Sequence, residues 1–343
     1  MSSSTKGLPQ WAMIQPLPAP VIAHLAQQAE RQGVVGVFAP QVYGPPFIPL
    51  AVAAGATEKL QLASGIAIAA ARSPFETAMA AIDMDRISGG RFTLGLGTSV
   101  SAWSQGLFGA PEHRPVQFLR ETIAAVRHVI AGAHCGLEPF EGHYFKADFR
   151  ELQPTEPPVR EQIPVWVAAL RAPLVRMAAE VADGVIGHPM WSIEWTLNEM
   201  YPEFLASLKK AGRQRSDIEV NIWPWAAINP DEKQAIEDSR PTMAFYGGVK
   251  QYESFFAAHG FEDVAKKLQE GVQRGDYLGV ARLVPDEMVR TFVAVGEPDK
   301  VRERISRLEG VADSVCIVPP AYGMTPEKAM YYSGKIAETF YIG

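Results

Sequence analysis

Cysteine is nearly absent from this chain, since only Cys135 and Cys316 occur among its 343 residues. Two cysteines cannot build the disulfide framework of a small secreted domain, and their scarcity is compatible with a reducing cytosol. No apolar run approaches the roughly 18 residues of a membrane span. The first ten residues also lack the apolar core of a signal peptide. We therefore expect a cytoplasmic protein that has no membrane partner.

The chain also has no excess of positive charge. The chain has 32 Lys and Arg against 38 Asp and Glu, a formal net charge of -6, and no basic block with interleaved aromatic residues. Nucleic acid is therefore not an expected partner. The sequence contains no Walker A pattern, HExxH, GxSxG or CxxC, and its seven histidines do not pair at helical spacing. These absences argue against a metal site and favour an enzyme that acts on a small molecule.

The pattern that remains is an alternation of short apolar runs with amphipathic helices. Strands are predicted at 11–15, 34–40, from 60 onward, 91–99, 163–170, 184–187, 218–228 and 314–318. A polar stretch at about 229–297 interrupts the rhythm before the last unit. The sequence thus predicts one α/β domain over residues 1–343, a (β/α)8 TIM barrel with a mainly helical insertion before the eighth unit. Such a barrel carries its chemistry at the carboxyl ends of its strands.

The strand predicted at 91–99 ends in small residues. Alternation places Gly95 and Gly97 on one face, where the missing side chains leave room for a ligand. Thr98 and Ser99 then offer hydroxyl and backbone N–H groups where α/β proteins bind phosphate, although a tight turn with capping hydroxyls explains them equally well. The run also begins like a dinucleotide-binding fingerprint, but Val100 stands where its third glycine belongs and the chain order fits a barrel better.

Several segments together resemble one known family. They are Ala63-Ser64-Gly65-Ile66-Ala67, Arg72-Ser73-Pro74-Phe75, the stretch 85–98 with its Leu94-Gly95-Leu96-Gly97-Thr98 end, Pro164-Val165-Trp166-Val167-Ala168-Ala169-Leu170 followed by Ala182-Asp183-Gly184, and Val295-Gly296-Glu297-Pro298. In this order they resemble the luciferase-like monooxygenase superfamily, particularly its branch that uses the deazaflavin coenzyme F420. The likeness spans nearly the whole chain, and the fourth-strand segment is its most specific element.

The resemblance implies a barrel with a flavin or deazaflavin lying across the strand ends, and a homodimer. It implies a non-prolyl cis peptide at Gly65–Ile66 behind the cofactor ring. The cofactor phosphate is expected at the turn after the fourth strand and at the start of the helix after the fifth. The implied cofactor-binding residues are Gly65, Ile66, Gly97, Thr98, Ser99, Ala168, Ala169, Leu170 and Arg171. Arg171 stands where the deazaflavin branch commonly has glycine, so it either adds charge to the phosphate site or is an exposed helix-start residue.

The catalytic groups depart from the family pattern. Many relatives have an Asp-His or Glu-His pair after the second strand and a carboxylate after the fourth, whereas this chain has Gln41-Val42 and Val100. His188 follows the sixth strand and is the best-placed titratable group that remains, so we name it and Tyr43 as candidate catalytic residues. A histidine beside a proline is often structural. Three tryptophans are expected around the cofactor with Tyr43, unless they only pack: Trp103, Trp191 and Trp195.

The function expected from this resemblance is hydride transfer between coenzyme F420 and a small, apolar organic substrate. A monooxygenase that uses flavin mononucleotide (FMN) and is supplied by a separate reductase is the first alternative. A flavin-binding protein without catalytic activity is the second, because the usual proton-transfer residues are missing.

Overall fold

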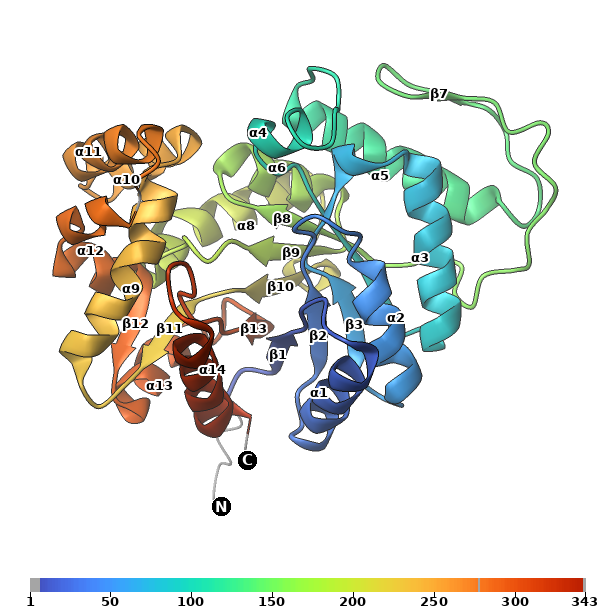
Figure 1. The fold of residues 1–343 in the computed structure, drawn as a ribbon. Coiled ribbons are helices and arrows are strands. Elements are labelled where there is room, and N and C mark those ends of the chain that lie inside the picture. The colour runs from blue at the N-terminus through green and yellow to red at the C-terminus, as the bar shows by residue number, and fades with distance from the viewer. Residues whose placement is uncertain (1–6, 277, 342–343) are drawn as a thin grey trace.

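The computed structural model describes residues 7–276 and 278–341, so residues 1–6 of the polar leader lie outside the described residues. Parallel strands occupy the centre of the molecule and helices surround them (Figure 1). The central strands are β1 (Gln10–Met13), β2 (Gly36–Ala39), β3 (Gln61–Ser64), β4 (Ala67–Ile68), β5 (Phe92–Gly97), β8 (Val165–Ala169), β9 (Gly184–Gly187), β10 (Glu219–Ile222) and β13 (Ser314–Cys316).

These strands close into a barrel. The hydrogen-bonded order is β3-β2-β1-β13-β10-β9-β8-β5-β4, and a further β3–β5 pairing joins the two ends. β3 and β4 both pair with β5 and are separated by two residues, so they are halves of one interrupted strand. Within the described residues the sheet is therefore a ring of eight parallel strands, and the predicted TIM-barrel fold is confirmed.

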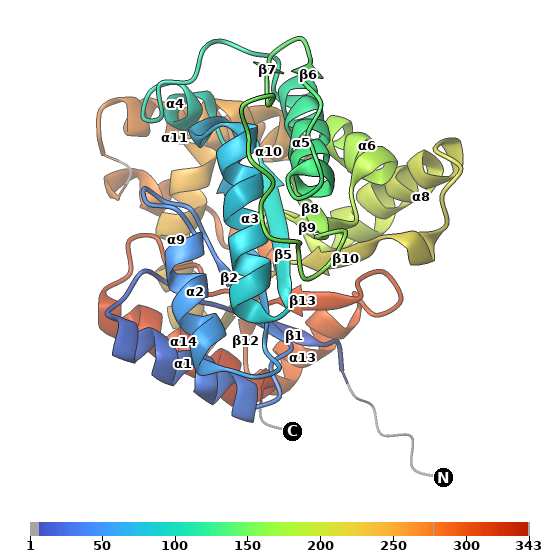
Figure 2. The same cartoon turned by 90° about the vertical axis from the view of Figure 1, so that its right-hand side faces the viewer.

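The barrel helices follow their strands in chain order. They are α1 (Ala19–Arg31), α2 (Phe47–Ala56), α3 (Pro74–Ser88), α4 (Ser101–Ser104), α5 (Pro115–Gly132), α6 (Ala172–Val181), α7 (Ile193–Trp195) with the π-helical turn η2 (Thr196–Met200), α8 (Tyr201–Lys210), α13 (Pro298–Ser306) and α14 (Pro326–Phe340). Figure 2 shows α3 and α5 on the outside of β5. No helix in the described part of the chain is long and apolar enough to cross a membrane.

Local sequence explains where α3 begins and ends. The Ser73 hydroxyl accepts the Glu76 N–H at 3.1 Å, and a proline occupies the first helical position. The helix stops at Gly89, whose φ of 65° is a left-handed conformation that glycine adopts without a steric cost. The chain then turns directly into β5.

Aromatic rings fill the interior of the barrel. Trp11 and Phe38 lie 4.5 Å apart by ring centroids, Phe38 and Trp223 lie 4.9 Å apart, and Trp11 and Trp166 lie 5.6 Å apart. All four side chains are buried. The barrel is therefore a packed core, and a ligand can bind only beyond the ends of its strands.

The seventh strand differs from its prediction over 218–228. It ends at Ile222, because Trp223 turns into the core and Pro224 has no N–H for a barrel ladder. β11 (Trp225–Ile228) keeps one parallel bridge to the chain after β13, between Trp225 and Val318, and pairs in parallel with β12 (Val293–Gly296). Between them lie α9 (Glu232–Gly247), η4 (Lys250–Tyr252), α10 (Glu253–Ala258), α11 (Glu262–Gln273) and α12 (Asp286–Phe292), on one side of the barrel in Figure 1.

A long excursion separates α5 from β8. It carries a short hairpin, β6 (Phe140–Glu141) with β7 (Lys146–Ala147), and reaches away from the barrel in Figure 1. Arg160 ties its far end to the barrel by an ion pair with Asp85, whose side chain is completely buried in α3. The excursion thus adds to the outside of the molecule and leaves the strand order unchanged.

Candidate ligand site at the strand ends

The predicted cofactor residues lie on neighbouring strands. In the closed ring, β2, the β3/β4 strand, β5, β8 and β9 follow one another without a gap. Their carboxyl ends carry, in that order, Gln41 and Tyr43, Gly65 and Ile66, Gly97 to Ser99, Ala168 to Arg171, and His188. The fold therefore brings residues from five chain segments into one continuous arc, where a ligand could span several strand ends.

The centre of this arc is the interruption between β3 and β4. The Gly65–Ile66 peptide bond is cis, as predicted. The Gly65 N–H donates to the Ala39 carbonyl at 2.8 Å, and the Ile66 carbonyl accepts the Gln41 N–H at 3.1 Å. A Cβ atom on Gly65 would lie 2.8 Å from both Phe38 and Trp223, so only glycine fits against the aromatic core here. The interruption is held from β2 on one side and from the core beneath.

The glycines of β5 do not leave open space, and this expectation was wrong. A Cβ on Gly95 would lie 1.9 Å from the Ser64 carbonyl oxygen, and one on Gly97 would lie 2.1 Å from the Ile66 side chain. The Ser64 hydroxyl also donates to the Gly95 carbonyl at 2.8 Å and accepts the Gly95 N–H at 2.9 Å. Both glycines therefore let the interrupted strand approach β5, and the Ile66 side chain occupies the space beside Gly97.

An anion-binding arrangement occurs where β5 and β8 end beside each other. Ser99 has a positive φ of 57°, a backbone shape that can turn successive N–H groups toward one point. α6 begins directly after Arg171, and no side chain caps its first N–H groups. Arg171 is exposed and forms no ion pair within the described residues. A helix N-terminus with a free guanidinium favours a phosphate group.

His188 lies at the other end of the arc and is half-buried. Its Nδ1 accepts the Met190 N–H at 3.1 Å, so in the neutral ring the proton is on Nε2. Burial lowers the pKa of His188 to about 4, which keeps the imidazole neutral at pH 7. The side chain is therefore a hydrogen-bond donor through Nε2 at neutral pH and holds little of the imidazolium that would donate a proton.

Three tyrosines around His188 were missed by the sequence analysis. The His188 ring lies 5.8 Å from Tyr246 and 6.0 Å from Tyr252, and Tyr322 lies 5.8 Å from Tyr246. Burial raises the pKa of Tyr252 to about 12, opposed by the nearby Arg171 charge, and burial also raises the pKa of Tyr246. The phenols stay protonated at neutral pH. No sequence pattern connects these residues to His188, because two come from the segment between β11 and β12 and the third from the loop after β13.

The other aromatic candidates are dispersed. Tyr43 is 75% exposed and stacks on Trp103 at 6.0 Å, across the ring from His188, because β2 and β9 are four strands apart. Trp191 is buried, and its indole N–H donates to the Leu170 carbonyl at 2.9 Å, which fixes the end of β8. Trp195 packs on Phe255 at 4.7 Å, which agrees with the alternative that it is a packing residue.

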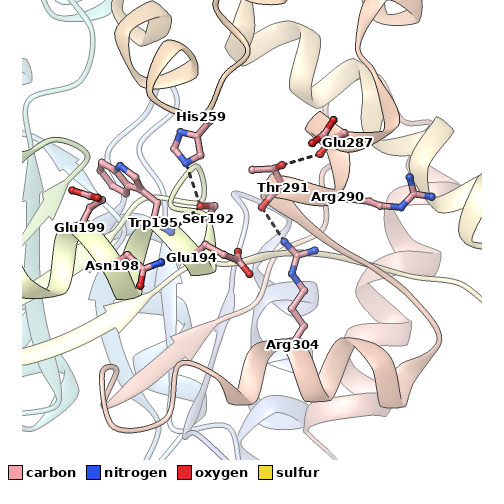
Figure 3. A pocket seen from close by; sticks show the side chains of 10 residues that line it. All are labelled: Ser192, Glu194, Trp195, Asn198, Glu199, His259, Glu287, Arg290, Thr291 and Arg304. Atoms are coloured by element: carbon pink, nitrogen blue, oxygen red, sulfur yellow. Dashed lines mark hydrogen bonds between the residues drawn. The ribbon is translucent and has the colours of Figure 1, made fainter.

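Trp195 also lines a cavity of about 610 Å³ between the segment after β9 and helices α10, α12 and α13 (Figure 3). There the His259 Nε2 lies 3.2 Å from the Ser192 hydroxyl, and His259 Nδ1 donates to the Phe255 carbonyl at 2.9 Å. Arg304 donates to two backbone carbonyls, of Val293 and Thr291. None of the predicted site residues borders this cavity. Its polar groups mainly join the segment between β11 and β12 to the barrel.

The strand ends fit a flavin-type cofactor on two observations. Trp223, beside Gly65, is 7% exposed, and its indole N–H finds no acceptor within the described residues. A buried donor of this kind is usually satisfied by a partner, which a heterocycle with carbonyl groups would provide. The second observation is the anion-binding arrangement at Ser99 and Arg171, which suits a phosphate group. Among the described residues no group of three or more His, Cys, Asp or Glu could hold a metal ion.

The fold is a (β/α)8 barrel, and the ends of β3/β4, β5 and β8 form its candidate ligand site. The family described as luciferase-like monooxygenase matches residues 9–314. The chain belongs to this family and is an enzyme.

Three similar proteins indicate the range of the family. A Mycobacterium tuberculosis protein provisionally named as a coenzyme F420-dependent oxidoreductase is 30% identical over 314 residues, which cover 86% of this chain and 89% of that protein. The solved coenzyme F420-dependent tetrahydromethanopterin reductase from Methanopyrus kandleri has a TM-score of 0.78 at 24% identity and covers 97% of this chain and 98% of its own. An FMN complex of a Baeyer-Villiger monooxygenase component from Pseudomonas putida has a TM-score of 0.66 at 15% identity, with 97% and 98% covered.

Proposed function

We propose that this protein is a coenzyme F420-dependent oxidoreductase that transfers a hydride to or from a small, uncharged organic substrate. The observation that carries the proposal is the juxtaposition of the unpaired Arg171, at the N-terminus of α6, with the Thr98–Ser99 turn on the neighbouring strand, beside the wall formed by Ile66. The mycobacterial relative that is 30% identical over most of the chain supports F420 as the cofactor.

The residues of the arc then have distinct roles. The Thr98 hydroxyl, the backbone near Ser99 and the Arg171 guanidinium would hold the phosphate end, and Ile66 would support one face of the ring. Bound F420 would supply a two-electron hydride carrier, because a deazaflavin has carbon in place of one flavin nitrogen. The protein would contribute mainly position and exclusion of water, and correct positioning alone lowers barriers by several kcal/mol.

The substrate would lie between the ring and the aromatic groups around His188. Those groups are the aromatic rings of Tyr246, Tyr252 and Tyr322. The phenols of Tyr246 and Tyr252 are neutral at pH 7, and so is His188. Such a surface suits an uncharged substrate with one oxygen acceptor. We therefore propose that His188 orients the substrate through Nε2–H. Tyr43, the other candidate, is 75% exposed and lies across the ring from His188, so we give it no part in orienting the substrate.

The cofactor assignment is tested by titrating the purified protein with F420 and with FMN under anaerobic conditions. Thr98→Val and Arg171→Ala should each weaken F420 binding by at least about tenfold, because hydrogen bonds to charged groups contribute roughly 1.5–3 kcal/mol. Arg176→Ala is the matched control, since Arg176 lies further along α6 and pairs with Glu203 on the surface. Unchanged F420 affinity in both site variants would refute the assignment of Thr98 and Arg171 to the phosphate site.

The same titration decides the alternatives. Tight FMN binding with no F420 binding, and turnover that requires dioxygen and a separate reductase, would identify a monooxygenase. The solved relative with bound FMN makes this the second candidate. Cofactor binding without turnover across a panel of ketones and alcohols would identify a binding protein.

A further inference from the structure

Gln41 follows β2 and is 7% exposed, although it is a polar residue at the mouth of the barrel. Its side-chain oxygen, Oε1, accepts the Ile68 N–H at 2.9 Å and an N–H of the Arg72 guanidinium at 3.2 Å. The Ile68 backbone N–H and the Arg72 guanidinium can only donate hydrogen bonds, not accept them. The amide oxygen must therefore face them, and the amide nitrogen must face away.

The amide nitrogen of Gln41 donates to no residue in the described part of the chain, and it remains accessible to solvent. Its backbone N–H reaches the Ile66 carbonyl at 3.1 Å, which places the residue directly beside the Gly65–Ile66 interruption. A side chain that is more than nine-tenths buried thus presents unused N–H donors at the wall of the site. Because this nitrogen reaches solvent and no described residue accepts from it, its N–H groups are free to donate to a bound molecule.

Arg72 strengthens this donor. Its side chain is only 11% exposed, lies over the Phe47 ring at 5.3 Å and pairs with Glu76 at 3.0 Å, so its position is fixed. A cationic donor on the amide oxygen draws electron density from the amide and makes its N–H groups better donors, because hydrogen bonds in a chain polarise one another.

We propose that Gln41 is a ligand-binding residue whose side-chain N–H donates to a carbonyl or oxyanion acceptor of the molecule bound at the Gly65–Ile66 wall. This inference rests on the proposed function. The Gln41 amide is neither a general acid nor a general base at neutral pH, so it would stabilise negative charge on the acceptor oxygen by hydrogen bonding alone. The acceptor belongs either to the cofactor ring or to the substrate, and the test distinguishes these sources.

The Gln41 side chain has two separable features: the N–H groups that would donate to the ligand, and the oxygen that accepts hydrogen bonds from Ile68 and Arg72, which we call the clamp. Two variants separate these features. Gln41→Glu keeps an oxygen for both clamp partners but loses the N–H donors, and Gln41→Met loses donors and clamp without adding charge. If Gln41 donates to the ligand, both variants weaken F420 binding, or raise the KM for 2-cyclohexen-1-one with F420, by about tenfold or more. The Gln41→Glu variant should keep the melting temperature of the wild type. Weakening in Gln41→Met alone would mean a clamp only, and weakening in Gln41→Glu alone would mean a charge effect; either result overturns the proposal.

The direct readout is the side-chain amide signal of Gln41 in protein labelled with ¹⁵N-glutamine, assigned by its absence from both variants. A downfield move of one amide proton on adding F420 places the acceptor on the cofactor, and a move only after adding 2-cyclohexen-1-one places it on the substrate. No move in either complex overturns the proposal. If the wild type binds neither F420 nor FMN, the proposed function fails first and this inference fails with it, before any variant is made.

Discussion

The close packing of Gly95 in β5 against the backbone of Ser64 in β3 predicts that Gly95→Ala is severely destabilising. The new Cβ would lie 1.9 Å from the Ser64 carbonyl oxygen, a backbone atom that cannot rotate away. Relief requires β3 and β5 to separate, which also breaks the two hydrogen bonds between the Ser64 hydroxyl and the Gly95 backbone. Overpacking costs about 1–3 kcal/mol and each lost buried hydrogen bond about 1 kcal/mol, so we expect a loss of about 4 kcal/mol.

Gly97→Ala is the matched control, two residues along the same strand. Its Cβ would meet the far end of the Ile66 side chain at 2.1 Å, and that side chain can change rotamer at a cost of about 1 kcal/mol. Thermal unfolding followed by circular dichroism should show the midpoint of Gly95→Ala falling by about 10 °C, and that of Gly97→Ala by only a few degrees. Equal midpoints for the two variants would refute the reasoning. Gly97→Ala should still weaken cofactor binding, since Ile66 moves.

Three further outcomes are expected. Burial lowers the pKa of His188 to about 4, below its ordinary 6.5, so the unfolded chain binds the proton first on acidification. Urea unfolding should show the free energy of unfolding falling between about pH 6.5 and 4, and His188→Gln should flatten part of that slope. Arg160→Ala should cost about 3 kcal/mol of stability, because it leaves the buried Asp85 carboxylate unpaired, and adding Asp85→Asn should restore part of the loss. Tyr246→Leu should raise KM for uncharged ring ketones several-fold and leave F420 affinity unchanged, as direct binding and steady-state kinetics would show.

Local patterns predicted the barrel well. Strands such as β2, β5 and β9 are short, fully buried and mainly apolar runs, and each of them can be recognised in the sequence by itself. The seventh strand was the exception, because β10 and β11 are both buried, and their apolar residues form one continuous run that Pro224 divides. Periodicity alone cannot show that the second half of such a run pairs outside the barrel.

The site was harder to predict, since it depends on contacts between distant segments. Gly95 and Gly97 were singled out as leaving room for a ligand, but the sequence could not show that Ser64 and Ile66 occupy this space. His188 was identified by its place after a strand. Its neighbours Tyr246 and Tyr252 lie about sixty residues away in the chain, and only the fold of the segment between β11 and β12 brings them back.

The pairing of β11 with β12 has an evolutionary consequence. These strands run parallel from Trp225↔Val293 to Ile228↔Gly296, so the segment between them leaves from one end of this short strand pair and returns to its other end. Insertions or deletions inside a segment whose two ends are both anchored on one strand pair place little strain on the rest of the molecule. The part of the surface that we propose faces the substrate can therefore change rapidly over generations, while the interlocked backbone of Ser64 and Gly95 tolerates almost no change. Selection for a new substrate would then act chiefly on residues 229–292.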